Sequence, residues 1–228
     1  MREVFHQSLE EVQSRLVEIA ELVTVAIDKA TRAFGTSDVA LAEEVIAGDA
    51  VIDQKSLALD ELAVEILAMQ QPVARDLRIV VAALRTSASL ERMGDLAEHI
   101  AQLARMRYPE RAIPNGFKTT FEQMGARDVE VARKLTELLR TQDIAIAAAI
   151  RDADDEIDEL HASVFEKVLG AQTAADAAAV VDATLASRYH ERFADHAVGV
   201  AKKMVYLATG DWSGSSDIAA SAVGTAEA

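Results

Sequence analysis

Carboxylates recur in this sequence as pairs separated by four residues, a spacing that places both side chains on one face of a helix. The two Cβ atoms of such a pair lie about 5–6 Å apart, so one cation can contact both carboxylates. Carboxylate oxygens suit magnesium, calcium, manganese and oxidised iron, and a nearby imidazole such as His99 or His196 shifts the preference towards iron or zinc. The candidate metal ligands are Asp49 and Asp53, Glu91 and Asp95, Asp154 and Asp158, and Glu191 and Asp195.

The acid pairs are duplicated in the same order along the chain. The segment GDAVID, which contains Asp49, recurs as DDEID, which contains Asp154, and SLERMGD recurs later as YHERFAD. Between these motifs, Gln71 of QQPVARD corresponds to Gln172 of AQTAAD. One isolated acid pair means little in a charged helical chain, but two kinds of motif repeated in register indicate two related halves.

The elements that position these motifs are helices. Three prolines, ten glycines and 4% aromatic residues, together with abundant Ala, Leu, Glu and Asp, are typical of a helical protein. The hydrophobic periodicity, read between helix breakers, predicts an all-α fold with six long helices. The second of them is expected to begin after Ser37 or Asp38, and the third at Pro72. The approximate bounds are 3–34, 38–69, 72–107, 117–140, 142–169 and 173–209.

The chain divides near its middle, where the segment YPERAIPNGF contains two of the prolines. We therefore expect two tandem repeats of a three-helix bundle, the first over residues 1–108 and the second over residues 117–210. Residues 109–116 form the linker between them. The remaining residues, 211–228, are small and polar and are expected to be disordered.

A helical wheel indicates how the acid pairs are oriented. Glu91 and Asp95 share one stripe of the third predicted helix, roughly opposite a core face that contains Leu90 and Met93. The sixth predicted helix repeats this register. The acid pairs are therefore expected to face away from the core of their own bundle, towards solvent, the other half or a partner.

Composition excludes several classes of protein. Lys and Arg total 23 against 38 Asp and Glu, and the net charge of -15 argues against binding to nucleic acid or adsorption on an anionic membrane. The absence of cysteine excludes disulfides, thiolate nucleophiles and Cys-ligated zinc. The opening residues MREVFHQSLEEV contain acids where a signal peptide needs an apolar stretch, and the sequence has no run of about 20 apolar residues such as a membrane-spanning helix needs. We therefore expect a soluble, cytoplasmic protein without direct membrane insertion.

Arginines beside the acid pairs permit a simpler interpretation. Arg92 and Arg192 lie next to the two Glu-x-x-x-Asp motifs, so these motifs could be a solvated acidic face with ordinary ion pairs. Arg78 and Arg85 precede Arg92 at intervals of seven residues and form a basic line on the same helix. This line could bind an anion or an acidic partner. Pairing with carboxylates of the second helix is the interpretation that we favour.

Taken in order, the motifs resemble those of the PhoU family of phosphate-signalling regulators. They lie at residues 48–53, 71–78, 90–95, 191–196 and 205–210. The resemblance covers about residues 1–210 and implies two three-helix bundles, a cytoplasmic homodimer and negative regulation of the phosphate-starvation response. It also implies two partners, a sensor histidine kinase and the ATPase or permease of a phosphate ABC transporter, and metal clusters on the acid motifs in some members. Phe193 and Ala194 replace the usual apolar-Gly pair, so helix contact there is expected to be looser or different.

Two other classes of function stay open. One is a metal-dependent, di-iron-like helical enzyme, and the other is a helical adaptor without metal. A di-iron enzyme needs a Glu-x-x-His motif from each of two helices, whereas this chain has one copy, Glu3 with His6. There is also no nucleophile arrangement and no Gly-rich phosphate loop. We therefore expect a regulatory protein and not an enzyme.

Overall fold

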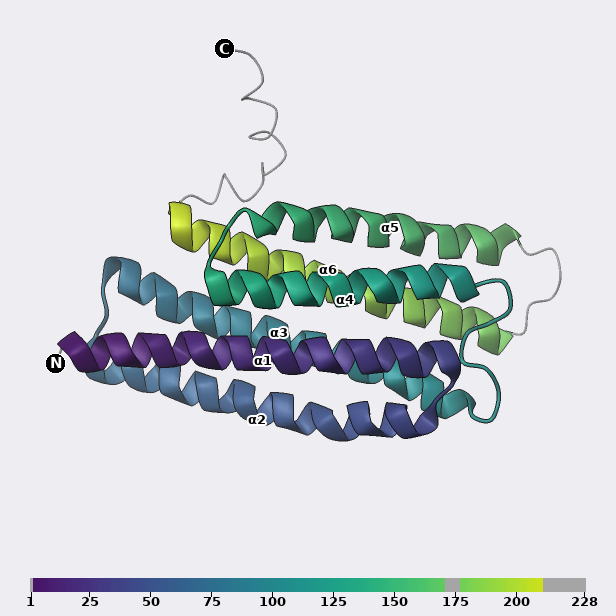
Figure 1. Ribbon diagram of the computed structural model, residues 1–228, viewed down its shortest axis with the longest axis horizontal. Coiled ribbons are helices and arrows are strands. Elements are labelled where there is room, and N and C mark those ends of the chain that lie inside the picture. Colours follow the sequence, from purple (N-terminus) through teal and green to yellow (C-terminus); the bar gives the residue numbers. More distant parts are fainter. Residues whose placement is uncertain (1, 171–176, 211–228) are drawn as a thin grey trace, which may run out of the picture.

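The computed structural model describes residues 2–170 and 177–210, and all regular secondary structure within these two ranges is α-helical (Figure 1). The prediction of an all-α fold with six long helices is confirmed. The helices are α1 (Arg2–Thr36), α2 (Val39–Gln70), α3 (Ala74–Arg107), α4 (Lys118–Thr141), α5 (Ile146–Gly170) and α6 (Ala177–Thr209).

The ends of the helices show which of the predicted helix boundaries are correct. Asp38 is the N-cap of α2, where its carboxylate accepts a hydrogen bond of 3.0 Å from the backbone N–H of Leu41. The predicted start of the third helix at Pro72 was wrong, because Val73 is extended and α3 begins at Ala74. The predicted start of the fifth helix was also wrong. Gln142 has a φ of 57° and closes α4, and α5 begins four residues later.

Two expectations fall on parts of the chain that the structure does not describe. The start of the sixth helix near residue 173 and the correspondence of Gln172 to Gln71 lie in the undescribed range 171–176. The expected disorder of residues 211–228 likewise concerns residues outside the described ranges.

The six helices form two packed groups of three (Figure 1). Helices α1, α2 and α3 pack against one another, and α4, α5 and α6 form the second group. Packing of α1 on α4 and of α3 on α6 joins the two groups, whereas α2 and α5 lie on the outside. The acid motifs of each half therefore lie on one outer and one central helix.

Helices α1 and α4 run antiparallel at the contact between the halves. Asp28 pairs with Arg133 at 3.8 Å, and Glu21, two turns earlier on α1, pairs with Arg140 on α4 at 2.5 Å. The helices are close because Gly125 has no side chain. A Cβ atom at Gly125 would lie only 2.9 Å from the Cβ of Thr31.

Helices α3 and α6 are also antiparallel. At one end of their contact, Arg107 forms two hydrogen bonds to Asp182, of which the Nη2–Oδ1 bond is 2.9 Å long. Towards the other end, the ammonium of Lys203 donates to Ser89 Oγ at 2.9 Å. The two ends of the α3–α6 contact therefore differ: one has an Arg–Asp ion pair, and the other has a lysine that donates to a serine hydroxyl.

The core consists of aliphatic and aromatic side chains from all six helices. Leu90 and Met93 are fully buried, as the wheel predicted, and so is Phe193 of α6. Burial of each such side chain contributes about 1.5–3 kcal/mol to folding. Among the described residues, no helix has the length and apolar character needed to span a membrane.

Candidate functional site

The acid pairs of the first half meet between α2 and α3. One carboxylate oxygen from each of Asp49, Asp53 and Asp95 lies within 4.8 Å of the other two. Asp49 and Asp95 are half-buried, whereas Asp53 is exposed. Glu91 lies one turn before Asp95 and is half-buried, but it is not one of these three groups. We call Asp49, Asp53 and Asp95 the first-half acid cluster.

The close approach of α2 and α3 at this cluster depends on Gly94. A Cβ atom at this position would lie 3.0 Å from Asp49 Oδ1 and 3.1 Å from Ile52 Cδ1. These separations are shorter than ordinary van der Waals contact, so a larger residue would displace the side chains of α2. The glycine of the LERMGD motif therefore allows Asp49 to lie beside Asp95.

The electrostatics of the cluster disfavour its fully ionised form. Burial raises the pKa of Asp49 to about 6, and the carboxylates of Asp53 and Glu98 are the next largest causes. Asp49 Oδ1 is buried and has no hydrogen-bond partner among the residues that the structure describes. A proton or a cation that reached this oxygen would remove the cost of burying it unpaired. Glu98 was not among the predicted residues, although it lies one turn after Asp95 in the sequence.

The acid pairs of the second half lie between α5 and α6. Burial raises the pKa of Asp154 to about 7, followed in size by the charges of Asp158 and Asp195. Asp154 Oδ1 and Glu191 Oε2 are buried without hydrogen-bond partners within the described ranges. Neighbouring carboxylates thus raise the pKa of Asp154 as they raise that of Asp49, and both residues are half-buried.

The two halves differ in how tightly the acids converge. Within the described part of the second half, no three carboxylates or imidazoles approach one another as closely as the first-half acid cluster does. Ala194 occupies the position that Gly94 has in the first half, and it is fully buried. We attribute the looser arrangement to this methyl group.

The predicted orientation of the acid pairs is correct for Asp53, Asp158 and Asp195, which are exposed, and was wrong for the others. Asp49 and Asp95 are half-buried between two helices of their own repeat, and Asp154 and Glu191 are half-buried in the equivalent place. A wheel treats one helix at a time. It cannot show that the acidic stripe of α3 meets the acidic stripe of α2 at the edge of the bundle.

Arginines on the solvent side partly neutralise both groups of acids. Arg92 pairs with Asp95 at 2.6 Å, Arg192 pairs with Asp195 at 3.3 Å, and Arg188 pairs with Glu191. The ion pairs of the simpler interpretation are therefore present. Such exposed pairs contribute about 0–1 kcal/mol each. Within the described residues, they leave the more deeply placed Asp49 and Asp154 without a cationic partner.

Neither histidine that was considered as a ligand joins the first-half acid cluster. His99 packs against Tyr189 of α6, with ring centroids 5.1 Å apart. His196 lies beside Arg192, and burial followed by the charge of Arg192 lowers its pKa. The grouped ligand atoms of the cluster are therefore all oxygens.

Buried hydroxyl groups near the acids were missed in the sequence. Ser56 of α2 and Ser87 of α3 are hydrogen-bonded at 2.6 Å, and His161 and Ser187 form a bond of 3.1 Å in the second half. These pairs occupy equivalent positions, because the repeat that relates Asp49 to Asp154 also relates Ser56 to His161. The repeat offset was the signal that could have found them.

A buried Asp-His pair was also missed. Asp128 of α4 and His190 of α6 are hydrogen-bonded at 2.5 Å, and both side chains are almost fully inaccessible. Burial raises the pKa of Asp128 to about 6 in spite of the opposing effect of His190. The sequence feature that could have revealed this pair is an aspartate on the core side of α4, one turn after the fully buried Met124.

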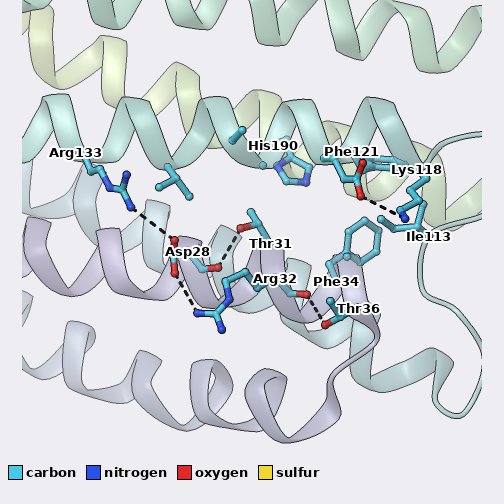
Figure 2. Close-up of a pocket in the computed structure, with 15 residues that line it drawn as sticks. Asp28, Thr31, Arg32, Phe34, Thr36, Ile113, Lys118, Phe121, Arg133 and His190 are labelled. Atoms are coloured by element: carbon cyan, nitrogen blue, oxygen red, sulfur yellow. Dashed lines mark hydrogen bonds and ion pairs between the residues drawn. The ribbon is translucent and has the colours of Figure 1, made fainter.

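His190 lines a cavity of about 540 Å³ between α1 and α4 (Figure 2). Figure 2 shows Asp28 between two arginines, Arg32 at 3.5 Å and Arg133 at 3.8 Å. Lys118 pairs with Glu122 at the other end. The charges at this cavity are therefore paired within the protein.

The basic line of α3 does not pair with α2, so the favoured interpretation was wrong. Arg92 pairs with Asp95 on its own helix. Arg78 and Arg85 have no carboxylate within 4.0 Å among the residues that the structure describes. These two arginines are exposed near the junction of α3 with α6.

The fold and the site together define a duplicated helical-bundle protein with an acidic motif on each repeat. The PhoU domain matches residues 16–104 and 121–204. The chain belongs to the PhoU family, which comprises accessory and regulatory proteins of phosphate transport and not enzymes. The di-iron-like enzyme considered from the sequence is therefore not retained.

Individual relatives extend this match over nearly the whole chain. The sequence is 41% identical over 210 residues to the phosphate-specific transport system accessory protein PhoU homolog 2 of Mycobacterium tuberculosis, covering 92% of this chain and 99% of the relative. It is 40% identical to PhoU homolog 1 of Mycobacterium leprae, with coverage of 93% and 96%. The crystal structure of PhoU from Pseudomonas aeruginosa is similar, with a TM-score of 0.83, 26% identity and coverage of 91% and 100%.

Proposed function

We propose that this protein is a negative regulator of phosphate uptake and of the phosphate-starvation response. It couples a phosphate ABC transporter, through the ATPase or permease, to a two-component sensor histidine kinase by protein-protein contacts. The observation that carries this proposal is the match of both repeats to the PhoU domain, together with 41% identity to a phosphate-specific transport accessory protein.

The same proposal includes the organisation and location of the protein. It acts as a homodimer in the cytoplasm, where its partners present their cytoplasmic faces. Each protomer has one repeat over residues 1–108, a linker over 109–116 and a second repeat over 117–210. The long, well-packed helices on both sides of the linker support this division.

We also propose that the acid motifs bind metal. Asp49, Asp53 and Asp95 hold one ion, with Glu91 beside them, and the buried unpartnered oxygen of Asp49 supports this assignment. A second, weaker site uses the equivalent residues of the other half, Asp154, Asp158, Glu191 and Asp195. An all-oxygen ligand set favours magnesium, manganese, calcium or ferric iron over zinc. The ion would neutralise the charges that raise the pKa of Asp49.

Gene deletion tests the regulatory role. Removal of the gene, in a strain without any other PhoU copy, is expected to raise expression of phosphate-starvation genes in phosphate-rich medium. Complementation with the unaltered gene restores repression. Normal repression in the deletion strain would contradict the proposed function, whatever metal the protein binds.

A metal-free adaptor is the alternative function, and the surroundings of Asp49 argue against it. A buried carboxylate oxygen without a partner, near two further acids, is a poor feature for a surface that only packs against proteins. Metal analysis of tag-free protein separates the two cases, since the adaptor would bind none.

A further inference from the structure

A second feature of the molecule is a small pocket where the N-terminal part of α3 meets the C-terminal part of α6. It encloses about 290 Å³. Its apolar side includes Leu77 and Val81, which are 40% and 36% exposed, and the nearly buried Ala82. Its cations are Arg78, Arg85 and Lys203. Tyr206 also lines the pocket, and we call these seven residues the α3–α6 pocket.

The cations of the α3–α6 pocket lack internal carboxylate partners. None of the three has an Asp or Glu oxygen within 4.0 Å in the described ranges, although the chain as a whole has a net charge of -15. The ammonium of Lys203 instead contacts Ser89 Oγ and the backbone oxygen of Arg85. In the described part of the chain, three like charges thus surround an apolar surface without a carboxylate partner.

The opposite end of the same helix contact provides an internal comparison. The repeat that relates Glu91 to Glu191 relates Ala82 to Asp182. Asp182 is buried and accepts hydrogen bonds from Arg107, so that end of the contact contains its own carboxylate. At the α3–α6 pocket, the positions equivalent to Asp182 and Arg107 are Ala82 and Leu207, so the whole ion pair is replaced by apolar residues. One end of the contact therefore has an internal ion pair, and the other has cations without a carboxylate among the described residues.

We propose that the α3–α6 pocket binds an acidic segment of a partner protein. The segment places one aliphatic side chain against Leu77 and Val81 and directs carboxylates to Arg78, Arg85 and Lys203. Arginine forks suit carboxylates, and exposed apolar area between charges is typical of a contact with a protein. This inference deepens the proposed function. It rests on that function only in assuming that the protein has a protein partner.

The size and surroundings of the pocket favour a peptide segment over other anions. A volume of about 290 Å³ is at the lower end of the range of about 300–1,000 Å³ that is typical of small-molecule sites, and it suits a single side chain. A nucleic acid or an anionic bilayer extends well beyond the pocket and would meet the acidic remainder of the surface. A short segment contacts the pocket alone.

The experiment uses the full-length protein, the synthetic peptide GEELEEG and its uncharged counterpart GQQLQQG. Methyl resonances of Leu77, Val81 and Ala82 are followed by NMR during each titration. The acidic peptide is expected to shift these resonances in a saturable manner, and the uncharged peptide is not. Absence of shifts, or equal shifts with both peptides, would overturn the proposal.

Variants locate the binding. Arg85→Glu is expected to weaken the acidic peptide by about tenfold or more, because it replaces an attraction with a repulsion at a desolvated contact. Ala82→Asp places a carboxylate beside the three cations of the pocket and is expected to abolish binding. Lys202→Glu is the control, since Lys202 is exposed on α6 next to Lys203 but does not line the pocket, and it should leave binding nearly unchanged.

Two further outcomes count against the proposal. If Arg85→Glu and Lys202→Glu weaken binding equally, the contact is a diffuse charge effect. If vesicles of phosphatidylglycerol shift the pocket resonances and the acidic peptide does not, the surface recognises a membrane. A failed peptide titration combined with derepression in the deletion strain would remove the pocket and leave the regulatory role intact.

Discussion

At the scale of single residues, Asp49 is the group on which the metal proposal most depends. Its pKa is about 6 in the folded protein against an ordinary value of 3.8. Between these values the folded state binds more protons than the unfolded chain. The stabilising effect of the protonated carboxyl is therefore fully present below pH 3.8 and is lost as the pH rises through 6.

Asp49→Asn is expected to change stability in opposite directions with and without metal. In metal-free protein at neutral pH it removes a charge that burial and neighbouring carboxylates disfavour. The free energy of unfolding is therefore expected to rise by about 1 kcal/mol, after allowance for solvent screening. With manganese present it removes a ligand and lowers stability relative to the unaltered protein. Thermal unfolding in EDTA and in manganese measures both. The same sign in both conditions would count against a cation at Asp49.

The buried Asp128-His190 pair makes a separate prediction. Asp128→Ala leaves His190 buried without its partner and is expected to cost about 3 kcal/mol. Asp128→Asn keeps an acceptor for the imidazole and is expected to cost less than about 1.5 kcal/mol. Urea unfolding at pH 7 distinguishes the two. Equal losses would indicate that the negative charge of Asp128 beside the imidazole, and not the volume of the side chain or a neutral hydrogen bond, stabilises this site.

At the scale of helices, Gly94 and Ala194 decide how closely the acids converge. Gly94→Ala is expected to displace α2 from α3 and to weaken metal binding in the first half by about tenfold or more. Ala194→Gly should tighten the second site, at a cost in helix stability of about 1 kcal/mol. Calorimetric titration with manganese measures both affinities.

Gly199→Ala is the control for these helix substitutions. A Cβ atom there would meet nothing closer than Lys203 Nζ at 4.0 Å. It should therefore raise stability slightly and leave metal binding unchanged. A similar loss of affinity in Gly94→Ala and Gly199→Ala would show that helix propensity, and not the contact with α2, is responsible.

The helices themselves could be predicted from local signals, whereas the site could be predicted only in part. The cap at Asp38 and the core positions Leu90 and Met93 follow from hydrogen-bonding and periodicity rules that act within one helix. The meeting of Asp49 with Asp95 depends on how two helices pack, which a single-helix pattern does not contain. For the same reason the sequence assigned Arg85 to a partner on α2 that it does not contact.

At the scale of the whole molecule, the duplication is not symmetric. Both repeats carry the acid motifs, but the first-half acid cluster contains the closer set of ligands. The α3–α6 contact contains an internal ion pair at Asp182 and, at the other end, a set of cations that has no carboxylate partner among the described residues. A chain with two unequal halves can present one surface to a metal ion and another to a partner. Its two proposed activities can therefore be separated by mutation.

The most direct test of the metal claim is the number of manganese ions bound per chain by tag-free protein, measured with Asp95→Ala and Asp195→Ala alongside. The predicted result is one tightly bound ion that is lost in Asp95→Ala and retained in Asp195→Ala. Circular dichroism should show that both variants keep their helices. Binding of no metal, or an equal loss in both folded variants, would contradict the assignment of the tight site to Asp49, Asp53 and Asp95.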